Sequence, residues 1–138
     1  MNTQEEVKNK MSEDSFYITN KTKSTLPRVP FAKIKEEALG KDYSLSLVFI
    51  GKRKSATLNY SYREKNKPTN ILSFPLDKKT GEIFITLELT REEAKKFERK
   101  HDNFIAFLFI HGLMHLKGME HGSRMEEAEA KLRKQFLV

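Results

Sequence analysis

The stretch that most constrains the fold is FIAFLFIHGLMHL, Phe104 to Leu116, which is apolar around nearly its whole circumference if it forms a helix. A helix that is hydrophobic on all sides must be buried on all sides. In a chain of 138 residues, the remaining elements have to surround that helix within one core. The stretch therefore predicts a buried central helix in a single compact domain.

The rest of the chain alternates between strand-like and helix-like segments. The patterns predict strands within 15–22, 43–51, 68–77 and 83–87, and helices within 30–40, 52–64, 89–118 and 123–138. Pro75 indicates that the third strand is an edge strand or carries a bulge. T-x-x-E at Thr90 and S-x-x-E at Ser123 resemble capping boxes. The order β-α-β-α-β-β-α-α predicts an α+β domain, in which a small mixed four-stranded sheet packs with helices around the central helix.

The N-terminal segment and the composition indicate in which cellular compartment the chain is expected to act. Residues 1–13 are polar, lack a secretory signal and have the composition of a disordered tail, which leaves one domain over 14–138. The chain has no cysteine, so a metal would need His, Asp or Glu ligands, and this fits a reducing compartment. No apolar run reaches the roughly 20 residues of a membrane span. We therefore expect a cytoplasmic protein with no membrane partner.

The net charge is strongly positive. The formal charge is +7, with a sequence pI of about 9.5. Such a balance favours a polyanionic partner, and RNA or DNA is the leading candidate.

Three of the four histidines follow a metal-ligand spacing, H-x-x-x-H-x-x-G-x-x-H, from His111 to His121. His111 and His115 are one turn apart on the same face of a helix. Gly118 can adopt the left-handed conformation that ends a helix, which lets His121 return as a third ligand. Three imidazoles leave a fourth position for an activated water, as in catalytic zinc sites. The spacing predicts one Zn²⁺ per chain, although histidine also suits nickel, copper and iron. His101 lies off this face in a charged run and is interpreted as an ordinary surface residue.

Gly112 stands where metzincin peptidases carry the glutamate that serves as general base. A peptidase would lack its base here, so either the chemistry differs or the base comes from elsewhere. Glu120 is a candidate base by proximity to His121, and a solvated turn residue is the preferred interpretation.

Three segments resemble the YbeY family of bacterial metal-dependent endoribonucleases. HGLMHLKGMEH resembles the family pattern H-G-x-L-H-L-x-G-[YF]-D-H, and LNYSYREKNKPTNILSFP resembles L-N-x-x-Y-R-x-K-x-x-P-T-D-V-L-S-F-P. GEIFI is similar to the family's G-D-I strand. The resemblance covers roughly Tyr43 to the C-terminus.

The resemblance implies a metal-dependent hydrolase domain with one zinc ion on His111, His115 and His121. It also implies cleavage of single-stranded RNA, notably in 16S rRNA 3′-end maturation, and a part in ribosome quality control, with the ribosome or its small subunit as partner. The family's functionally important arginine corresponds to Arg63.

Four positions depart from the family pattern. Asn70 and Glu82 replace aspartates, and Met119-Glu120 replaces an aromatic residue and an aspartate. None is a predicted ligand, but the changes weaken any role for an acid at 70 or 120.

The chemistry that follows is attack of water on an RNA phosphodiester, with the metal and Arg63 sharing the charge on the phosphate oxygens. Basic residues on either side of this segment are expected to contact phosphates. These RNA-binding candidates are Lys52, Arg53, Lys54, Lys65 and Lys67. The basic residues within 95–100 and 131–134 alternate with glutamates and are interpreted as solvated helix faces.

Two alternatives remain open from the sequence. One is a zinc hydrolase that acts on peptides or small molecules. The other is a non-catalytic, ribosome-associated zinc-binding module, in which an acidic side chain would complete the ligand shell.

Overall fold

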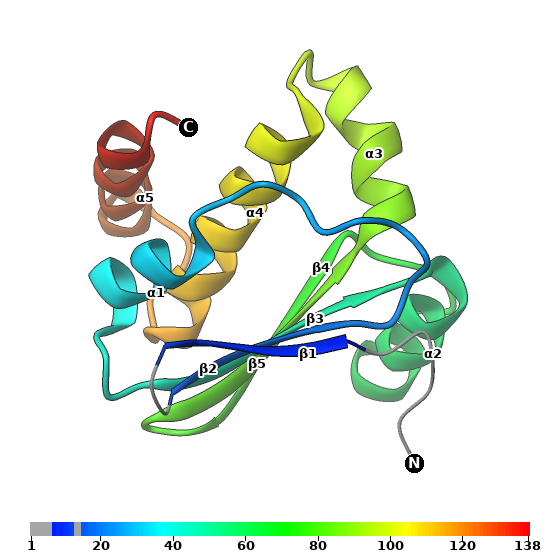
Figure 1. Ribbon diagram of the computed structural model, residues 1–138, viewed down its shortest axis with the longest axis horizontal. Coiled ribbons are helices and arrows are strands. Elements are labelled where there is room, and N and C mark those ends of the chain that lie inside the picture. The colour runs from blue at the N-terminus through cyan, green and yellow to red at the C-terminus, as the bar shows by residue number, and fades with distance from the viewer. Residues whose placement is uncertain (1–6, 13–14) are drawn as a thin grey trace.

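The computed structural model describes residues 7–12 and 15–138, which form one mixed sheet packed with helices (Figure 1). The strand order is β1-β2-β3-β5-β4; β2, β3 and β5 are parallel, while β1 and β4 pair antiparallel at the two edges. The elements are β1 (Val7–Ser12), β2 (Phe16–Asn20), α1 (Phe31–Leu39), β3 (Ser44–Ile50), α2 (Lys52–Arg63), β4 (Ile71–Asp77), β5 (Thr80–Thr86), α3 (Leu87–Lys96), α4 (His101–Leu116) and α5 (Ser123–Phe136). The α+β class and the mixed sheet are confirmed.

Strand β1 extends the sheet beyond the four strands that the sequence predicts. It lies within residues 1–13, whose composition indicated a tail, and it pairs with β2 from Val7 to Ser12. Its sequence, VKNKMS, has two lysines and little apolar alternation, which is typical of an edge strand and gives a weak strand signal. The remainder of the expected tail, 1–6 and 13, lies outside the described residues.

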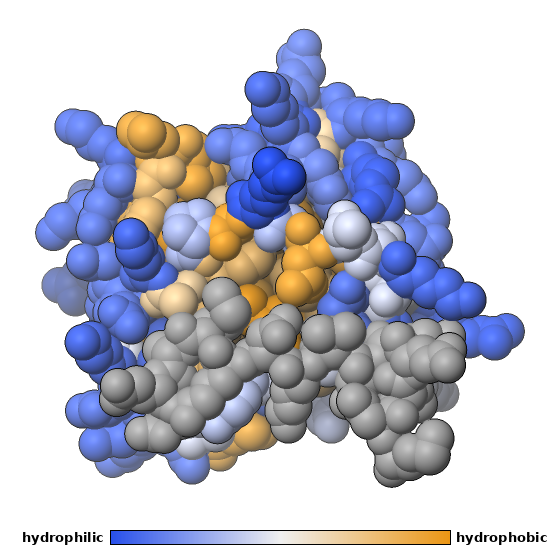
Figure 2. Space-filling model, viewed as in Figure 1, coloured by the Kyte–Doolittle hydropathy of each residue, from blue (hydrophilic) through white to orange (hydrophobic). Residues whose placement is uncertain are grey.

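Helix α4 is the predicted central helix. Ten of its sixteen residues are buried and occupy most of its circumference, whereas Phe107, His111 and His115 on one face are partly exposed. It contacts β4 and β5 of the sheet, and also α1, α3 and α5 (Figure 1). Phe109 at its centre meets the edge of the Phe31 ring with centroids 5.0 Å apart and stacks on Phe16 at 6.3 Å. On the face drawn in Figure 2, hydrophobic side chains are visible between rims of hydrophilic ones.

The single long helix expected over 89–118 is wrong, because the chain forms α3 and α4 with a break at 97–100. Glu98 in the break has a left-handed φ of 54°. Both capping boxes are also wrong. Helix α3 already begins at Leu87, and Thr90 donates its hydroxyl to the Leu87 carbonyl from inside the helix. Helix α5 has Gly122 as its N-cap residue, with no side-chain capping bond.

The expectation for Pro75 is confirmed. Strand β4 is an edge strand, and its register with β5 shifts between Pro75 and Asp77. The edge position tolerates the missing N–H of proline. In the part of the chain that the structure describes, every helix is too short or too polar to cross a membrane.

Candidate metal centre

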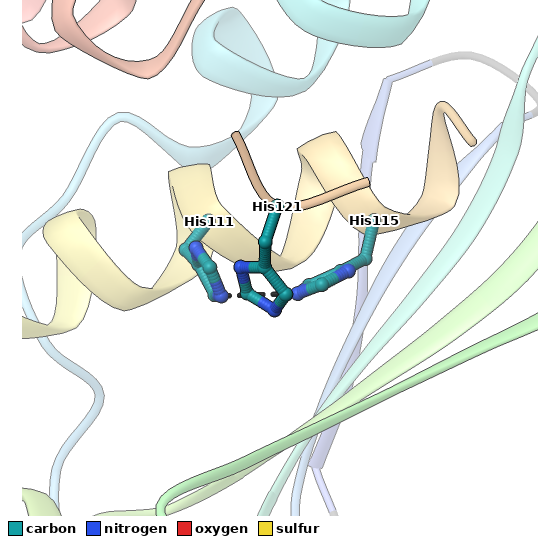
Figure 3. A group of neighbouring side chains, drawn as sticks. All are labelled: His111, His115 and His121. Atoms are coloured by element: carbon teal, nitrogen blue, oxygen red, sulfur yellow. Dashed lines mark hydrogen bonds between the residues drawn. The ribbon is translucent and has the colours of Figure 1, made fainter. Parts of the chain in front are cut away.

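The three histidines of the spaced motif come together at the C-terminal end of α4 (Figure 3). His111 and His115 project from α4, and His121 projects from the segment before α5. One ring nitrogen from each lies within 4.8 Å of the others, and the Nε2 atoms of His111 and His115 are 3.0 Å apart. Three converging imidazole nitrogens match the ligand set of a tetrahedral zinc site with one open position. Among the described residues, no carboxylate joins this group as a fourth ligand.

The turn after α4 returns His121 to the other two histidines. Gly118 has φ of +88°, and its N–H donates to the His115 carbonyl at 3.0 Å. The Met119 N–H donates to the Met114 carbonyl at 3.1 Å, which completes a Schellman motif. The left-handed glycine predicted at this position therefore ends the helix and reverses the chain.

Glu129 holds the outer side of His111. Its Oε2 lies 2.7 Å from His111 Nδ1, so a proton on Nδ1 is donated to the carboxylate and Nε2 remains free for a metal. Glu129 is 9% exposed and also pairs with Arg133 at 3.5 Å. The sequence reasoning missed it, although its spacing from Met125 and Leu132 places an acid on the buried stripe of α5. A carboxylate on such a stripe requires a partner, so its place in the sequence could have indicated that Glu129 contacts a polar or charged group.

The surroundings of His115 favour its neutral form. Burial, together with the nearby His111 and His121, lowers the pKa of His115. The neutral form is the one that binds a metal. His101, by contrast, lies at the other end of α4, where its Nε2 is 2.9 Å from the Thr90 hydroxyl. Because it is partly buried and bonded there, it is not the surface residue that the sequence indicated.

Gly112 lies where α4 approaches the sheet closely. A Cβ at this position would lie 2.9 Å from Ile71 Cδ1 and Ser73 Oγ, and 3.2 Å from Ile83 Cδ1. Real Cβ atoms rarely approach side chains so closely, so the position has no room for a glutamate. The absence of the peptidase base thus has a packing reason: the helix that carries the histidines lies directly on β4 and β5.

A cleft of about 1050 Å³ opens in front of the histidines. One wall carries the three histidines, Phe107 and Glu129, from α4, α5 and the segment between them. A second wall comes from the end of α2, from the segment before β4 and from β4 itself. Its lining includes Tyr62, Arg63, Thr69, Asn70, Ser73 and Phe74. The structure therefore brings Arg63 and the three histidines into one cleft.

Buried polar side chains of α2 fix this second wall. Ser55 donates to the Thr69 carbonyl and accepts from the Thr69 N–H, both at 2.9 Å. Asn59 donates to the Lys67 carbonyl at 2.9 Å. These bonds attach the segment before β4 to α2, and they set the position of Arg63 at the end of that helix. Asn70 extends the connection to α3, since its amide donates to Glu93 at 2.9 Å.

The RNA-binding candidates divide into two groups. Lys65 and Lys67 line a smaller hollow of about 270 Å³ that also includes Arg63 and adjoins the main cleft. Lys52 lies at the start of α2 and pairs with Glu92 at 2.6 Å. Arg53 and Lys54 are exposed and line neither hollow. The structure therefore places only the pair after α2 beside the cleft.

Comparison with known proteins agrees with this architecture. The model of the family described as Endoribonuclease YbeY matches residues 6–137. A protein named Endoribonuclease YbeY from Alkaliphilus oremlandii is 31% identical over 132 residues, covering 88% of this chain and 86% of the relative. One of the same name from Onion yellows phytoplasma is 36% identical, covering 83% and 80%. A solution structure from Thermotoga maritima superposes with a TM-score of 0.60 at 25% identity, covering 77% of this chain and 78% of that one.

The fold and the site define an α+β protein with a three-histidine group that can bind a metal at the end of a buried helix. Within that class, the match over nearly the whole chain is decisive. The chain belongs to the Endoribonuclease YbeY family.

Proposed function

We propose that this protein is a zinc-dependent endoribonuclease that hydrolyses phosphodiester bonds of single-stranded RNA. The observation that carries the proposal is that His111, His115 and His121 share one cleft with Arg63. The chain's family membership and its net charge of +7 support RNA as the substrate.

Each group has a distinct part in the reaction. The imidazoles of His111, His115 and His121 would hold a zinc ion, which would supply Lewis-acid chemistry and activate water near neutral pH. Arg63 binds the scissile phosphate, because a guanidinium is always charged and can donate two parallel hydrogen bonds to phosphate oxygens. Glu129 keeps His111 in the tautomer and orientation that presents Nε2 to the cleft.

The packing at Gly112 favours this reaction over peptide hydrolysis. The peptidase glutamate follows the first histidine of its motif, and here that position is pressed against Ile71 and Ser73. The nearest acid to that histidine, Glu129, is bonded to His111 Nδ1. A phosphodiester fits the site better, since Arg63, Lys65 and Lys67 offer positive charge next to it.

The proposal extends to a biological substrate. We infer that the RNA is ribosomal, that the cleavage serves 16S rRNA 3′-end maturation and ribosome quality control, and that the small subunit is the partner in the cytoplasm. Family membership supports this extension. Incubation of the protein with small subunits that carry unprocessed 16S rRNA should shorten the 3′ end. If the subunits stay unprocessed while free RNA is cut, the ribosomal assignment is wrong.

A matched set of variants tests the activity. Zinc content and cleavage of a labelled single-stranded RNA are measured for wild type, His115→Ala, Arg63→Ala and Arg28→Ala. His115→Ala should lose both metal and cleavage. Arg63→Ala should keep the metal and lose about 100-fold or more in rate, the usual effect of removing one charge-stabilising donor. Arg28 is exposed on the loop before α1, so its variant controls for loss of one positive charge.

The outcomes separate the possible functions. Cleavage that survives in both active-site variants would come from a contaminant and would contradict the proposal. A wild-type protein that binds zinc without cutting RNA would instead be a non-catalytic zinc module.

A further inference from the structure

Three phenylalanine rings form a continuous stack on the α3–α4 side of the molecule. Phe97 and Phe104 stack with centroids 5.6 Å apart at 22°, and Phe104 and Phe107 stack at 6.2 Å and 9°. Phe104 is buried, whereas Phe97 at the end of α3 is 64% exposed. The stack therefore has one end in solvent.

The other end of the stack lies in the metal cleft. Phe107 is one helical turn before His111 on α4, and both line the cleft. The row of rings thus runs from the protein surface to the metal centre.

Two guanidinium groups from different elements meet at Phe107. The Arg99 Cζ lies 4.6 Å from the ring centroid, and the Arg133 Cζ lies 5.4 Å from it. Arg99 comes from the break between α3 and α4, and Arg133 comes from α5. Both groups are anchored, because Arg99 donates to the Asn103 side chain and Arg133 pairs with Glu129. Planar cations held beside an aromatic ring are suited to stack on further π-systems.

Core packing explains only part of this arrangement. Phe104, with Leu108 and Ala94, belongs to a small hydrophobic cluster against which Phe107 packs. A packing role accounts for neither the exposed ring of Phe97 nor the two cations beside Phe107. Lys95, Lys96 and Lys100 are also exposed on the same segment. Aromatic rings interleaved with basic residues are the usual components of a single-stranded nucleic-acid surface.

We propose that Phe97, Arg99, Phe107 and Arg133, here called the stacking row, bind bases of the RNA strand on one side of the scissile phosphate. The inference rests on the proposed function and specifies how that site holds its substrate. Because every base has a π-face, the row provides length-dependent binding with little sequence preference. It also assigns a role to Arg99 and Arg133, whose surroundings in the sequence suggested solvated helix faces.

Substrate length provides the test. Initial rates of the zinc-loaded protein are measured on single-stranded RNA of about 3 and about 12 nucleotides, lengths below and within the usual range of such binding sites. For Phe97→Leu and Arg99→Gln we expect KM for the long RNA to rise roughly 5- to 100-fold, with kcat/KM for the short RNA unchanged. Leucine at position 97 retains apolar packing on Phe104, so a change in KM reports the loss of the aromatic ring.

Matched variants control for exposure, charge and folding. Tyr60→Leu removes a ring that is 58% exposed on α2, and Arg28→Gln removes a positive charge away from the cleft. Both should behave as wild type. Phe97→Trp keeps an aromatic ring at this position, so it should bind the long RNA as tightly as wild type or more tightly. An RNA carrying 5-iodouridine should crosslink to a peptide that contains Phe97 or Phe107.

The results separate the inference from the function beneath it. If wild type cleaves RNA but Phe97→Leu and Arg99→Gln show the same KM for both lengths as wild type, the stacking row is wrong and the nuclease assignment stands. If wild type cleaves neither RNA, the proposed function fails and the inference fails with it.

Discussion

The two ends of α4 each carry histidine, and they use it differently. At the first residue, His101 is partly buried and its Nε2 bonds to the Thr90 hydroxyl of α3. In the last two turns, His111 and His115 direct their Nε2 atoms toward each other, and Glu129 holds His111 from behind. At the first end, the imidazole of His101 has a hydrogen-bond partner within the protein. The second end leaves ring nitrogens converging on a point in the cleft.

The difference shows that the contacts made by the ring nitrogens decide what a histidine does. A hydroxyl of an adjacent helix makes His101 a link between α3 and α4. A carboxylate on the far side makes His111 an oriented candidate ligand. Residue type and helix are the same in both cases, so only the supporting contacts separate a structural histidine from a candidate ligand.

The largest effect should come from Gly112, which sets how closely the functional end of α4 approaches the sheet. Gly112→Glu would introduce the peptidase base. Instead, we expect it to lower the free energy of unfolding by more than about 3 kcal/mol, because the side chain overlaps Ile71 and Ser73 and its carboxylate is buried. Chemical denaturation measures the loss. Gly112→Ala, with one added methyl group, should cost about 1 to 3 kcal/mol. A stable Gly112→Glu protein would mean that the helix can move away from β4.

A smaller effect should follow from removal of the carboxylate that distinguishes the two ends. Glu129→Gln retains the shape of the side chain but loses its charge, so metal affinity should fall about 10- to 100-fold. Competition with a zinc chelator measures the affinity directly. Glu127→Gln, an exposed residue on the same helix, should leave it unchanged. Equal zinc affinities for the two variants would show that metal binding by His111 does not need the Glu129 carboxylate.

The smallest effect concerns His101. Burial, reinforced by Arg91, lowers its pKa in the folded protein. Because the unfolded chain then binds the proton first, stability should decrease as the pH falls through the unfolded pKa of about 6.5 toward the lower folded value. The partial exposure of the ring keeps this loss below about 1 kcal/mol. His101→Gln should show a shallower decline than wild type between about pH 7.5 and 5.5, measured by urea unfolding. Parallel curves for the two proteins would rule out this coupling.

The sequence predicted the parts of this protein that depend on local spacing. The apolar circumference of 104–116 predicted the central helix, and the spacing from His111 to His121 grouped the residues that meet in space. Gly118 predicted the turn between them. Each of these inferences needs only the geometry of one helix and its end.

Features decided by tertiary contacts were not predicted. The segment EEAKKFERK is favourable for helix, yet the chain breaks at 97–100, where Phe97 folds back to stack on Phe104. β1 has little apolar pattern because it lies at an edge. Glu129 is four residues from one core residue and three from another on α5, but its partner is eighteen residues away in sequence. Asn70 is similar: its departure from the family's aspartate makes sense beside Glu93, which would repel a second carboxylate.

The position of Glu129 on α5 also has a consequence for the timing of synthesis. α5 is the last element described, and it both covers α4 and supplies the carboxylate behind His111. A chain is made from its N-terminus, so the sheet and α4 emerge first. During that interval His111 has no carboxylate behind it. The centre is therefore completed late, when nearly the whole domain has left the ribosome, and an unfinished chain carries its histidines without a finished site.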